Sequence, residues 1–441
     1  MLDRLTSLET FGIKLGLENI SRLCEALGHP ERSFTTLHVA GTNGKGSVTA
    51  MAHAALRAAG LRTARYTSPH LADITERFVI GDSAVDTATF NAVALEVLDL
   101  ADRLVADGTL RVLPTFFEAT TAIAFELFRR ASVEVAVIEV GLGGRFDATN
   151  VITPVAGAIT TIGFDHQQHL GSTLAEIAFE KAGIIKPGMT VVAGALPPSA
   201  MDVVRRVASE RGATLVETAA DSKVTAEAID GASRVTIDTP HGRYGPLTLA
   251  LRGDHQVGNA LVATRLLETA AAHGVPVTAD HIERGLSSAE WPARLEYIQL
   301  DGRRRVLLDS AHNAEGAGAL AAHLRRWHPE GMPLVVGIMR DKDVQDILSP
   351  LLPLTSRVIA TSAPTPRALP ADELAARVRT AAERLGLTRL TVEVDEDPLQ
   401  AVDRALAVSD LVGVAGSIFL VGPLRERLLS RAVAPAPPQV R

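Results

Sequence analysis

The chain contains one cysteine in 441 residues, Cys24, so it cannot form a disulfide within itself. A lone thiol is typical of a reducing compartment, and we expect a cytoplasmic protein. Aromatic residues make up only 4% of the chain, which leaves few rings to stack on a flat ligand. Basic residues are outnumbered by acidic ones, 44 against 51, and the formal net charge is −7. We therefore do not expect a nucleic acid as the main partner.

Long apolar runs are missing as well. No uninterrupted stretch approaches the roughly 20 residues that a membrane helix needs, so we expect no membrane segment. The first ten residues mix charges with leucines and do not predict a signal peptide. The chain is 46% hydrophobic and 22% charged, which is typical of a globular protein, and its length favours two domains.

Strand-like and helix-like segments alternate along the chain, which predicts an α/β protein with mostly parallel sheets. A short polar stretch at 287–292, closed by a proline, favours a domain over residues 1–288 and a smaller Rossmann-like domain over 289–441. The proline-rich tail at 432–441 is expected to be flexible. The expected strands lie at 36–40, 133–140, 155–162 and 189–193, and then at 295–300, 305–309, 334–338, 357–361, 390–394 and 417–422.

The most informative segment is 36–47, which reads Thr-Leu-His-Val-Ala-Gly-Thr-Asn-Gly-Lys-Gly-Ser. A short apolar run enters a glycine-rich turn, and an alanine-rich helical pattern follows over 48–59. Glycines let backbone N–H groups approach an anion, and a helix N-terminus adds partial positive charge. Lys45 would reach the outer phosphates of a nucleotide, and the Ser47 hydroxyl would ligate Mg²⁺. The spacing departs from the usual phosphate loop because Gly46 separates Lys45 from Ser47, and an ordinary glycine-rich turn is the alternative.

Three further side chains of the first domain fit a metal-assisted site. Glu139 lies at the end of the apolar strand 133–140, where a nucleotide-bound Mg²⁺ needs a carboxylate; the run after it lacks the spacing of an NAD-binding turn. His166 follows another expected strand and would coordinate metal at the same sheet edge. Lys181 lies near the end of an apolar helix. It is either a surface lysine or a neutral amine that adds CO₂ and becomes a carbamate, an oxygen ligand for Mg²⁺.

Two segments of the second domain carry candidate nucleotide contacts. Arg294 follows Trp291-Pro292 and presents a planar set of donors that suits phosphate oxygens. Asp309 lies at the end of an expected strand, and His312 follows in the next loop. We expect these side chains to close over a nucleotide held by the first domain.

Together these motifs resemble those of folylpolyglutamate synthase and dihydrofolate synthase, within the Mur ligase superfamily, over nearly the whole chain. The runs that carry the resemblance are 12–20, 38–47, 66–71, 76–77, 115–118, 141–150, 180–186 and 253–256, followed by Asn259 and the motifs of Arg294, Asp309 and His312. The run Gly-Gly-Arg-Phe-Asp-Ala-Thr-Asn is similar to that of the bacterial bifunctional enzymes. The chain departs from the family at Ser310 and Ala314, where Gly and Pro are usual.

The resemblance implies a role for each matching residue. The first domain would bind ATP and the pterin substrate, and the second would be the glutamate ligase domain. The implied catalytic residues are Lys45, Lys181, His166 and Glu139. The implied ATP contacts are Thr42, Asn43, Gly44, Lys45, Gly46, Ser47, Asn259, Arg294, Asp309 and His312. Two Mg²⁺ ions would be held by Ser47, Ser68, Glu139, His166 and Lys181, the last matching a carbamylated lysine. The implied pterin contacts are Thr115, Phe117, Asp147 and Ala148.

The implied reaction is the ATP-dependent joining of L-glutamate to 7,8-dihydropteroate and to tetrahydrofolate or its polyglutamates, through an acyl phosphate, by a monomer. Four alternatives stay open at this point. They are a folylpolyglutamate synthase without the dihydrofolate synthase activity, a ligase of cell-wall precursors, a non-catalytic nucleotide-binding protein and a Rossmann dehydrogenase. Cell-wall ligases usually have Lys followed directly by Thr or Ser, whereas Gly46 intervenes here.

Overall fold

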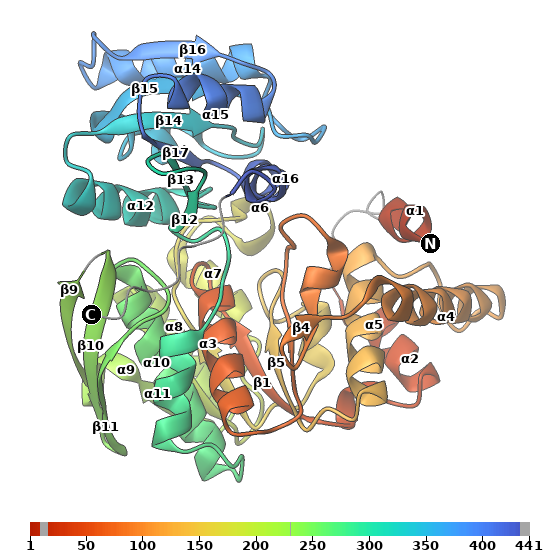
Figure 1. Ribbon diagram of the computed structural model, residues 1–441. Helices are drawn as coiled ribbons and strands as arrows, with labels where there is room; N and C mark the ends of the chain where they lie inside the picture. Colours follow the sequence, from red (N-terminus) through yellow and green to blue (C-terminus); the bar gives the residue numbers. More distant parts are fainter. Residues whose placement is uncertain (9–15, 230, 433–441) are drawn as a thin grey trace. The chain divides into compact units, whose positions relative to one another are not determined.

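The computed structural model describes residues 1–8, 16–229 and 231–432, and it divides into two compact units (Figure 1). The first unit comprises Met1–Ala228, Arg234–Ala250 and Gln256–Glu290, and the second comprises Ile229–Ser233, Leu251–His255 and Trp291–Arg441. The domain boundary given above remains a prediction. Of the tail expected to be flexible, all but Ala432 lies outside the described residues, as do residues 12–15 of the first family run.

Within the described residues, an eight-stranded sheet forms the centre of the first unit. In order across the sheet, its strands are β4 (Ser83–Ala84), β3 (Phe78–Ile80), β2 (Thr63–Tyr66), β5 (Val135–Glu139), β1 (Thr35–Ala40), β6 (Ala156–Ile159), β7 (Thr190–Ala193) and β8 (Thr214–Glu217). The strands from β2 to β8 are parallel, whereas β3 and β4 are antiparallel at one edge. Strand β5 is buried along its whole length, and β1 is buried beyond its first residue; this explains their continuous apolar runs.

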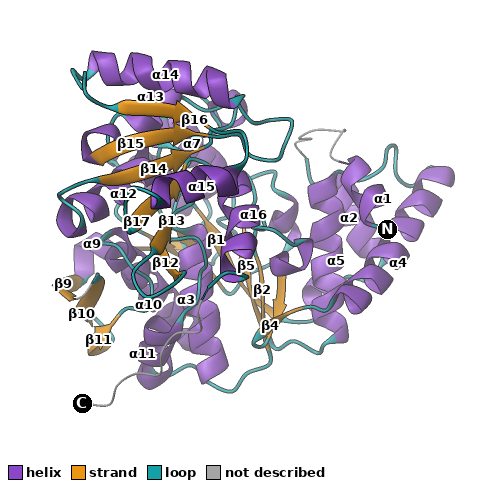
Figure 2. Ribbon diagram, turned by 45° about the horizontal axis from the view of Figure 1, so that its top comes forward, coloured by secondary structure: helices purple, strands orange, loops and turns teal. Residues whose placement is uncertain are grey.

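Along the chain α-helices follow β1, β6, β7 and β8, whereas β5 leads to β6 through loops and one 3₁₀ turn, and Figure 2 shows helices beside the strands. The helices of the first unit are α1 (Leu2–Thr6), α2 (Glu18–Ala26), α3 (Lys45–Ala58), α4 (Thr87–Ala106), α5 (Phe116–Arg130), α6 (Gln167–Leu170), α7 (Leu174–Ala182), α8 (Pro198–Glu210), α9 (Thr218–Asp221), α10 (His255–Ala272) and α11 (Ala279–Ser288). Helices α3 and α11 lie side by side. A Cβ on Gly285 would be 2.5 Å from the backbone nitrogen of Ala55, so the two helices approach this closely only with glycine at 285.

The scarce aromatic residues concentrate in one core of the first unit. Tyr66 stacks on Phe78 with ring centroids 5.6 Å apart, and Phe78 packs on Phe90 at 5.2 Å. All three rings are fully buried. Aromatic pairs at such distances add about 0.5–1.5 kcal/mol each beyond the area they bury, so these rings contribute mainly to stability.

A small sheet of this unit was not predicted from the sequence. It consists of β9 (Lys223–Ile229), β10 (Ala232–Thr239) and β11 (Gly242–Thr248), with β10 and β11 antiparallel. A buried polar network joins it to α10: the Tyr244 hydroxyl donates to Glu268 Oε1 at 2.7 Å, and Arg265 Nη1 donates to Glu268 Oε2 at 2.6 Å. The sheet therefore depends on charged residues of α10.

The second unit is a smaller α/β layer around a six-stranded sheet, counted over the described residues. In order across the sheet, its strands are β12 (Glu296–Gln299), β13 (Arg305–Leu308), β17 (Leu411–Ala415), β14 (Met332–Val336), β15 (Thr355–Ala360) and β16 (Thr391–Val394). Only β12 is antiparallel to its neighbour. The helices are α12 (Ala314–Trp327), α13 (Val344–Leu348), α14 (Ala371–Arg384), α15 (Pro398–Leu406) and α16 (Ile418–Leu429). No helix among the described residues of either unit has the length and apolarity to cross a membrane.

The strand expected at 417–422 is wrong, because residues from Ile418 onward form helix α16. The Ser417 side chain accepts a hydrogen bond from the backbone N–H of Phe419 and caps the helix. Gly416, at φ 111°, turns the chain out of β17 just before this cap. An apolar run of four residues has no readable period, so a buried strand and the first turn of a buried helix look alike in sequence. The true strand lies just before it, at Leu411–Ala415.

Candidate functional site

The glycine-rich turn expected to bind phosphate lies between β1 and α3, and its glycines are required by their neighbours. Gly41 has φ 150°, and a Cβ there would be 1.9 Å from Thr160 Oγ1. Gly44, at φ 83°, forms the N-cap of α3, and a Cβ there would be 2.4 Å from Asn259 Oδ1. The turn is also bound to the segment after β6, since the Thr42 N–H donates to the Thr161 carbonyl at 2.8 Å. The loop is therefore held open at a helix N-terminus, as an anion site requires.

Two lysine amines converge on this turn. Lys45 Nζ donates to the Gly41 carbonyl at 3.1 Å and to the Thr42 carbonyl at 3.1 Å. Lys181 Nζ, from helix α7, donates to the same Gly41 carbonyl at 2.9 Å, and its side chain is buried. The two amines can be no more than about 6 Å apart, since both contact one oxygen. Lys45 thus places a cationic group beside a helix N-terminus, which favours a highly charged anion.

A chain of amide and hydroxyl groups extends from the start of α3 to α10. Gln256 Nε2 donates to Ser47 Oγ at 3.2 Å, and Asn259 Nδ2 donates to Gln256 Oε1 at 2.9 Å. These three side chains are buried. The structure thus brings Ser47 and Asn259 together with Gly44, as the sequence-based assignment requires, and it adds Gln256 between them.

The other expected metal ligands lie at the carboxyl ends of neighbouring strands. The strand order β2-β5-β1-β6 places Ser68, Glu139, the phosphate loop and the segment leading to His166 along one edge of the sheet. Glu139 is buried at the end of β5, next to Val39 of β1, whereas the His166 side chain is 42% exposed. Nowhere in the part of the chain that the structure describes do three His, Cys, Asp or Glu side chains gather to hold a metal. The metal assignment therefore stays a prediction that relies on serine hydroxyls and Lys181 as further ligands.

The expected pterin contacts surround the loop after β5. A Cβ on Gly141 would be 2.4 Å from Phe117 Cζ, so the Phe117 ring lies directly on this glycine. The Asp147 carboxylate accepts the Leu142 N–H at 2.8 Å, and burial raises its pKa. Thr115 caps α5, and Ala148 begins the short 3₁₀ helix η4 (Ala148–Val151). Asp147 thus holds the shape of its own loop, and the Phe117 ring and Gly141 form one wall beside it.

In the second unit, Arg294 and Asp309 lie on adjacent strand ends. Asp309 Oδ2 accepts the Leu295 N–H at 3.0 Å, and Asp309 Oδ1 accepts the Ala311 N–H at 2.9 Å. Burial raises the pKa of Asp309, while nearby Arg294 acts against this shift. Arg294 is flanked by two residues in the left-handed region, Ala293 at φ 57° and Leu295 at φ 47°. His312 Nδ1 lies 2.9 Å from the Ser310 carbonyl. The backbone here is strained, and Asp309 anchors it.

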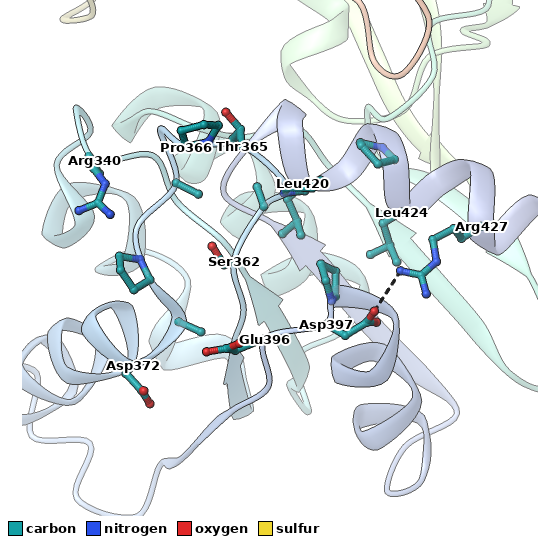
Figure 3. Close-up of a pocket in the computed structure, with 17 residues that line it drawn as sticks. Arg340, Ser362, Thr365, Pro366, Asp372, Glu396, Asp397, Leu420, Leu424 and Arg427 are labelled. Carbon is teal, nitrogen blue, oxygen red and sulfur yellow. Dashed lines mark hydrogen bonds and ion pairs between the residues drawn. The ribbon is translucent and has the colours of Figure 1, made fainter.

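A pocket of about 720 Å³ opens at the carboxyl ends of β15 and β16 in the second unit (Figure 3). Cationic and anionic side chains both line it, and Asp397 Oδ2 pairs with Arg427 Nη1 at 3.4 Å. The N-termini of α14 and α15 also border it, through Ala371 and Pro398. Its charged lining residues are Arg340, Asp372, Glu396, Asp397 and Arg427. The carboxyl edge of a parallel sheet is where α/β proteins bind small molecules, and mixed charge suits a zwitterion.

Comparison with known proteins identifies the family. Residues 110–267 match the Mur ligase middle domain, and residues 293–418 match the Mur ligase glutamate ligase domain. The chain is 35% identical to folylpolyglutamate synthase of Lacticaseibacillus casei, over 93% of this chain and 94% of that protein. It is 33% identical to dihydrofolate synthase/folylpolyglutamate synthase of Bacillus subtilis, over 95% of this chain and 96% of that protein. The chain belongs to the folylpolyglutamate synthase/dihydrofolate synthase family of Mur ligases.

A solved structure of the same family agrees over the whole length. The structure of Escherichia coli FolC in complex with DHPP and ADP has a TM-score of 0.84 and 29% identity, and the match covers 97% of each chain. The family resemblance and the fold class expected from the sequence are thus confirmed. The chain is a ligase of the ADP-forming, acid–amino acid class.

Sequence reasoning missed parts of the ligase site that carry no charge. Thr160, Thr161 and Gln256 hold the phosphate loop through side-chain hydrogen bonds, but none of them was assigned a role. Thr160 Oγ1 donates to the Asn43 carbonyl at 2.5 Å, and Asn43 N–H donates to Thr161 Oγ1 at 3.0 Å. The available signal was a pair of threonines directly after an apolar strand, which places both hydroxyls at the carboxyl edge of the sheet.

Proposed function

We propose that this ligase uses ATP to join L-glutamate to 7,8-dihydropteroate and to tetrahydrofolate or its polyglutamates, through an acyl phosphate. The observation that carries the proposal is the convergence of Lys45 Nζ and Lys181 Nζ on the Gly41 carbonyl, at the N-terminus of α3. Phosphoryl transfer depends mostly on positioning and on neutralising oxygen charge. A preformed turn with the Lys45 amine and the Lys181 metal ligand beside it is suited to a nucleoside triphosphate with bound Mg²⁺.

Each residue then has a specific task in the phosphoryl step. Backbone N–H groups of Gly44 and Gly46 and the Lys45 amine would hold the phosphates, while Thr42 and Asn43 would fix the turn through their bonds to Thr161 and Asn259 would close the loop from α10. The acceptor's carboxylate oxygen attacks the γ-phosphorus, the bond to the β–γ bridging oxygen breaks, and ADP leaves. The α-amine of glutamate then attacks the acyl carbon, the bond between that carbon and the phosphate oxygen breaks, and phosphate leaves as the amide forms and the amine loses a proton.

The residues present fit Mg²⁺, which prefers oxygen ligands. Ser47, Ser68 and Glu139 supply hydroxyl and carboxylate oxygens, and a carbamylated Lys181 would add a further oxygen ligand. We assign two ions to these residues together with His166. When bound, Mg²⁺ neutralises phosphate charge. The buried position of Lys181 supports the carbamate, because burial favours an uncharged amine and CO₂ adds only to that form.

Substrate positions follow from the two units taken separately. In the first unit we assign the pterin to the wall that Phe117 and Gly141 form near Thr115, Asp147 and Ala148. In the second unit we assign Arg294, Asp309 and His312 to the nucleotide, and the 720 Å³ pocket to L-glutamate. Arg340 and Arg427 would face its carboxylates, while Glu396 would face its ammonium group.

The decisive experiment measures ADP release with Mg²⁺-ATP and L-glutamate, and it compares dihydropteroate with tetrahydrofolate as acceptor. Turnover with both acceptors supports the bifunctional assignment. Turnover with tetrahydrofolate alone identifies a folylpolyglutamate synthase only, which is the alternative. No turnover with either acceptor refutes the proposal. ADP release without any folate-type acceptor, but with a cell-wall precursor, would favour that class instead.

Isotope transfer tests the acyl phosphate separately. An acceptor carrying ¹⁸O in the reacting carboxylate should transfer one ¹⁸O atom to the released phosphate, because the carboxylate oxygen that attacks phosphorus leaves with it. Recovery of unlabelled phosphate would contradict this intermediate while leaving the ligase assignment intact. The Lys45→Met variant serves as the control without phosphoryl transfer.

A further inference from the structure

One phenol oxygen in the second unit contacts two imidazoles, and none of these three side chains has been assigned a role above. Tyr297, on β12, has its hydroxyl oxygen 2.8 Å from His323 Nε2 and 2.7 Å from His328 Nε2. His323 lies on α12 and is 5% exposed, and His328 follows the end of that helix with a side chain 12% exposed. Three potential metal donors therefore converge on one point from two different elements.

The spacing of these donors is close to that of a coordination shell. Zinc bound at about 2.0–2.1 Å places two tetrahedral ligands roughly 3.3 Å apart. The two nitrogen–oxygen distances, 2.7 and 2.8 Å, would each have to open by roughly 0.5 Å to admit the ion. His328 lies outside the helix, at its C-cap, so its side chain is free of the helical backbone constraint. We propose that Tyr297, His323 and His328 bind a late first-row divalent metal ion, such as Zn²⁺ or Cu²⁺.

Burial disfavours ionisation of the Tyr297 phenol, whereas two nearby guanidinium groups favour it. The guanidinium carbon of Arg252 lies 5.1 Å from the Tyr297 ring centroid, and that of Arg305 lies 5.8 Å from it. Both cations lower the pKa of Tyr297, against the larger effect of burial. Burial lowers the pKa of His323 to about 4, so its ring is neutral at pH 7 and has a lone pair for a metal. The remaining charged or titratable groups that act on the two imidazoles are Asp254, His255 and Glu330.

Metal type and pH dependence follow from this donor set. Imidazole nitrogen suits Zn²⁺, Cu²⁺ and Ni²⁺, whereas Mg²⁺ prefers oxygen ligands, so the cluster should not compete for the Mg²⁺ of the ligase reaction. Binding replaces the phenol proton of Tyr297, so one proton is released for each ion bound. The affinity should therefore rise by about tenfold per pH unit below the pKa of the phenol.

The test uses the full chain, stripped of metal and free of nucleotide. Zn²⁺ affinity is measured by competition with a chromophoric chelator, and Cu²⁺ is added separately as a spectroscopic probe. The wild type should bind one Zn²⁺ per chain. His323→Ala and His328→Ala should each weaken this site by more than about 100-fold, since loss of an outer-shell partner alone costs about 10–100-fold. The exposed residue His241 provides a control, because His241→Ala should change nothing.

Tyr297→Phe keeps the ring under Arg252 and removes only the oxygen, so it tests the cluster even if the alanine variants fail to fold. It should abolish the phenolate-to-Cu²⁺ charge-transfer absorption of the wild type and weaken Zn²⁺ binding. The proposal is overturned if the wild type binds no Zn²⁺ at this stoichiometry. Equal affinity in His328→Ala, or an unchanged Cu²⁺ spectrum in Tyr297→Phe, overturns it as well.

Discussion

Replacing Gly44 by alanine should disable the phosphate loop far more than it destabilises the protein. Gly44 has φ 83°, and a Cβ there would lie 2.4 Å from Asn259 Oδ1. A matched control exists at Gly28, which has φ 77° and no heavy atom within 4 Å of a built Cβ. Both substitutions put alanine into left-handed backbone, which costs about 1–2 kcal/mol. The contact with Asn259 is what distinguishes them.

The magnitude follows from that contact. Asn259 must retreat by roughly 1 Å to restore an ordinary non-bonded separation from the new methyl group. A misplacement of about 1 Å in a positioning residue can cost about 100-fold in rate. We therefore expect Gly44→Ala to lower kcat/KM for ATP by about 100-fold, whereas Gly28→Ala should leave kcat/KM unchanged and lower only the free energy of unfolding, by about 1–2 kcal/mol.

Steady-state ADP release and urea unfolding measure the two quantities. A double-mutant cycle with Asn259→Ala isolates the contact, because in that background Gly44→Ala should cost no more unfolding free energy than Gly28→Ala does. Equal kcat/KM values for Gly44→Ala and Gly28→Ala would refute the reasoning. So would an unfolding penalty for Gly44→Ala that stays the same when the Asn259 side chain is absent.

Three further outcomes are expected. Burial lowers the pKa of His53 to about 3, below the ordinary 6.5, so the unfolded state takes up the proton and stability falls as pH decreases from about 6.5 toward 3. In urea titrations near pH 5, His53→Gln should reduce the slope of the unfolding free energy with pH by about 1.4 kcal/mol per pH unit. The exposed control His241→Gln should leave that slope unchanged. Ala293 has φ 57°, a left-handed conformation that glycine adopts without strain, so Ala293→Gly should leave the free energy of unfolding unchanged or raise it by up to about 1 kcal/mol. A loss above about 1 kcal/mol in urea unfolding would contradict the inference that the backbone is strained at this residue. Arg340→Ala should raise the KM for L-glutamate at least about tenfold with little change for ATP, and equal effects from the exposed control Arg389→Ala would reject the pocket assignment.

The sequence predicted the elements whose signals are local. The apolar run 36–40, the glycine-rich turn and the alanine-rich helix after it are read from neighbouring residues, and the structure has them as β1, the loop and α3. The strand expected at 417–422 is wrong because its apolar run is too short to show a period, and the Ser417 side chain caps a helix there instead. The strands β10 and β11 were missed although their pairing is local, because they mix buried and exposed residues and form no continuous apolar run.

The sequence could indicate which residues belong to the candidate site but not how they are arranged, because the order of the strands across the sheet differs from their order along the chain. Along the chain the strands come as β1, β2, β5 and β6, whereas the sheet orders them β2-β5-β1-β6. Only that order puts Glu139 beside the phosphate loop and brings Ser68 to the next strand. The contact of Lys181 with the Gly41 carbonyl spans 140 residues and depends on where α7 packs. Residue types can therefore indicate which chemistry a chain carries, while the order of parallel strands decides which of those residues can act on one phosphate.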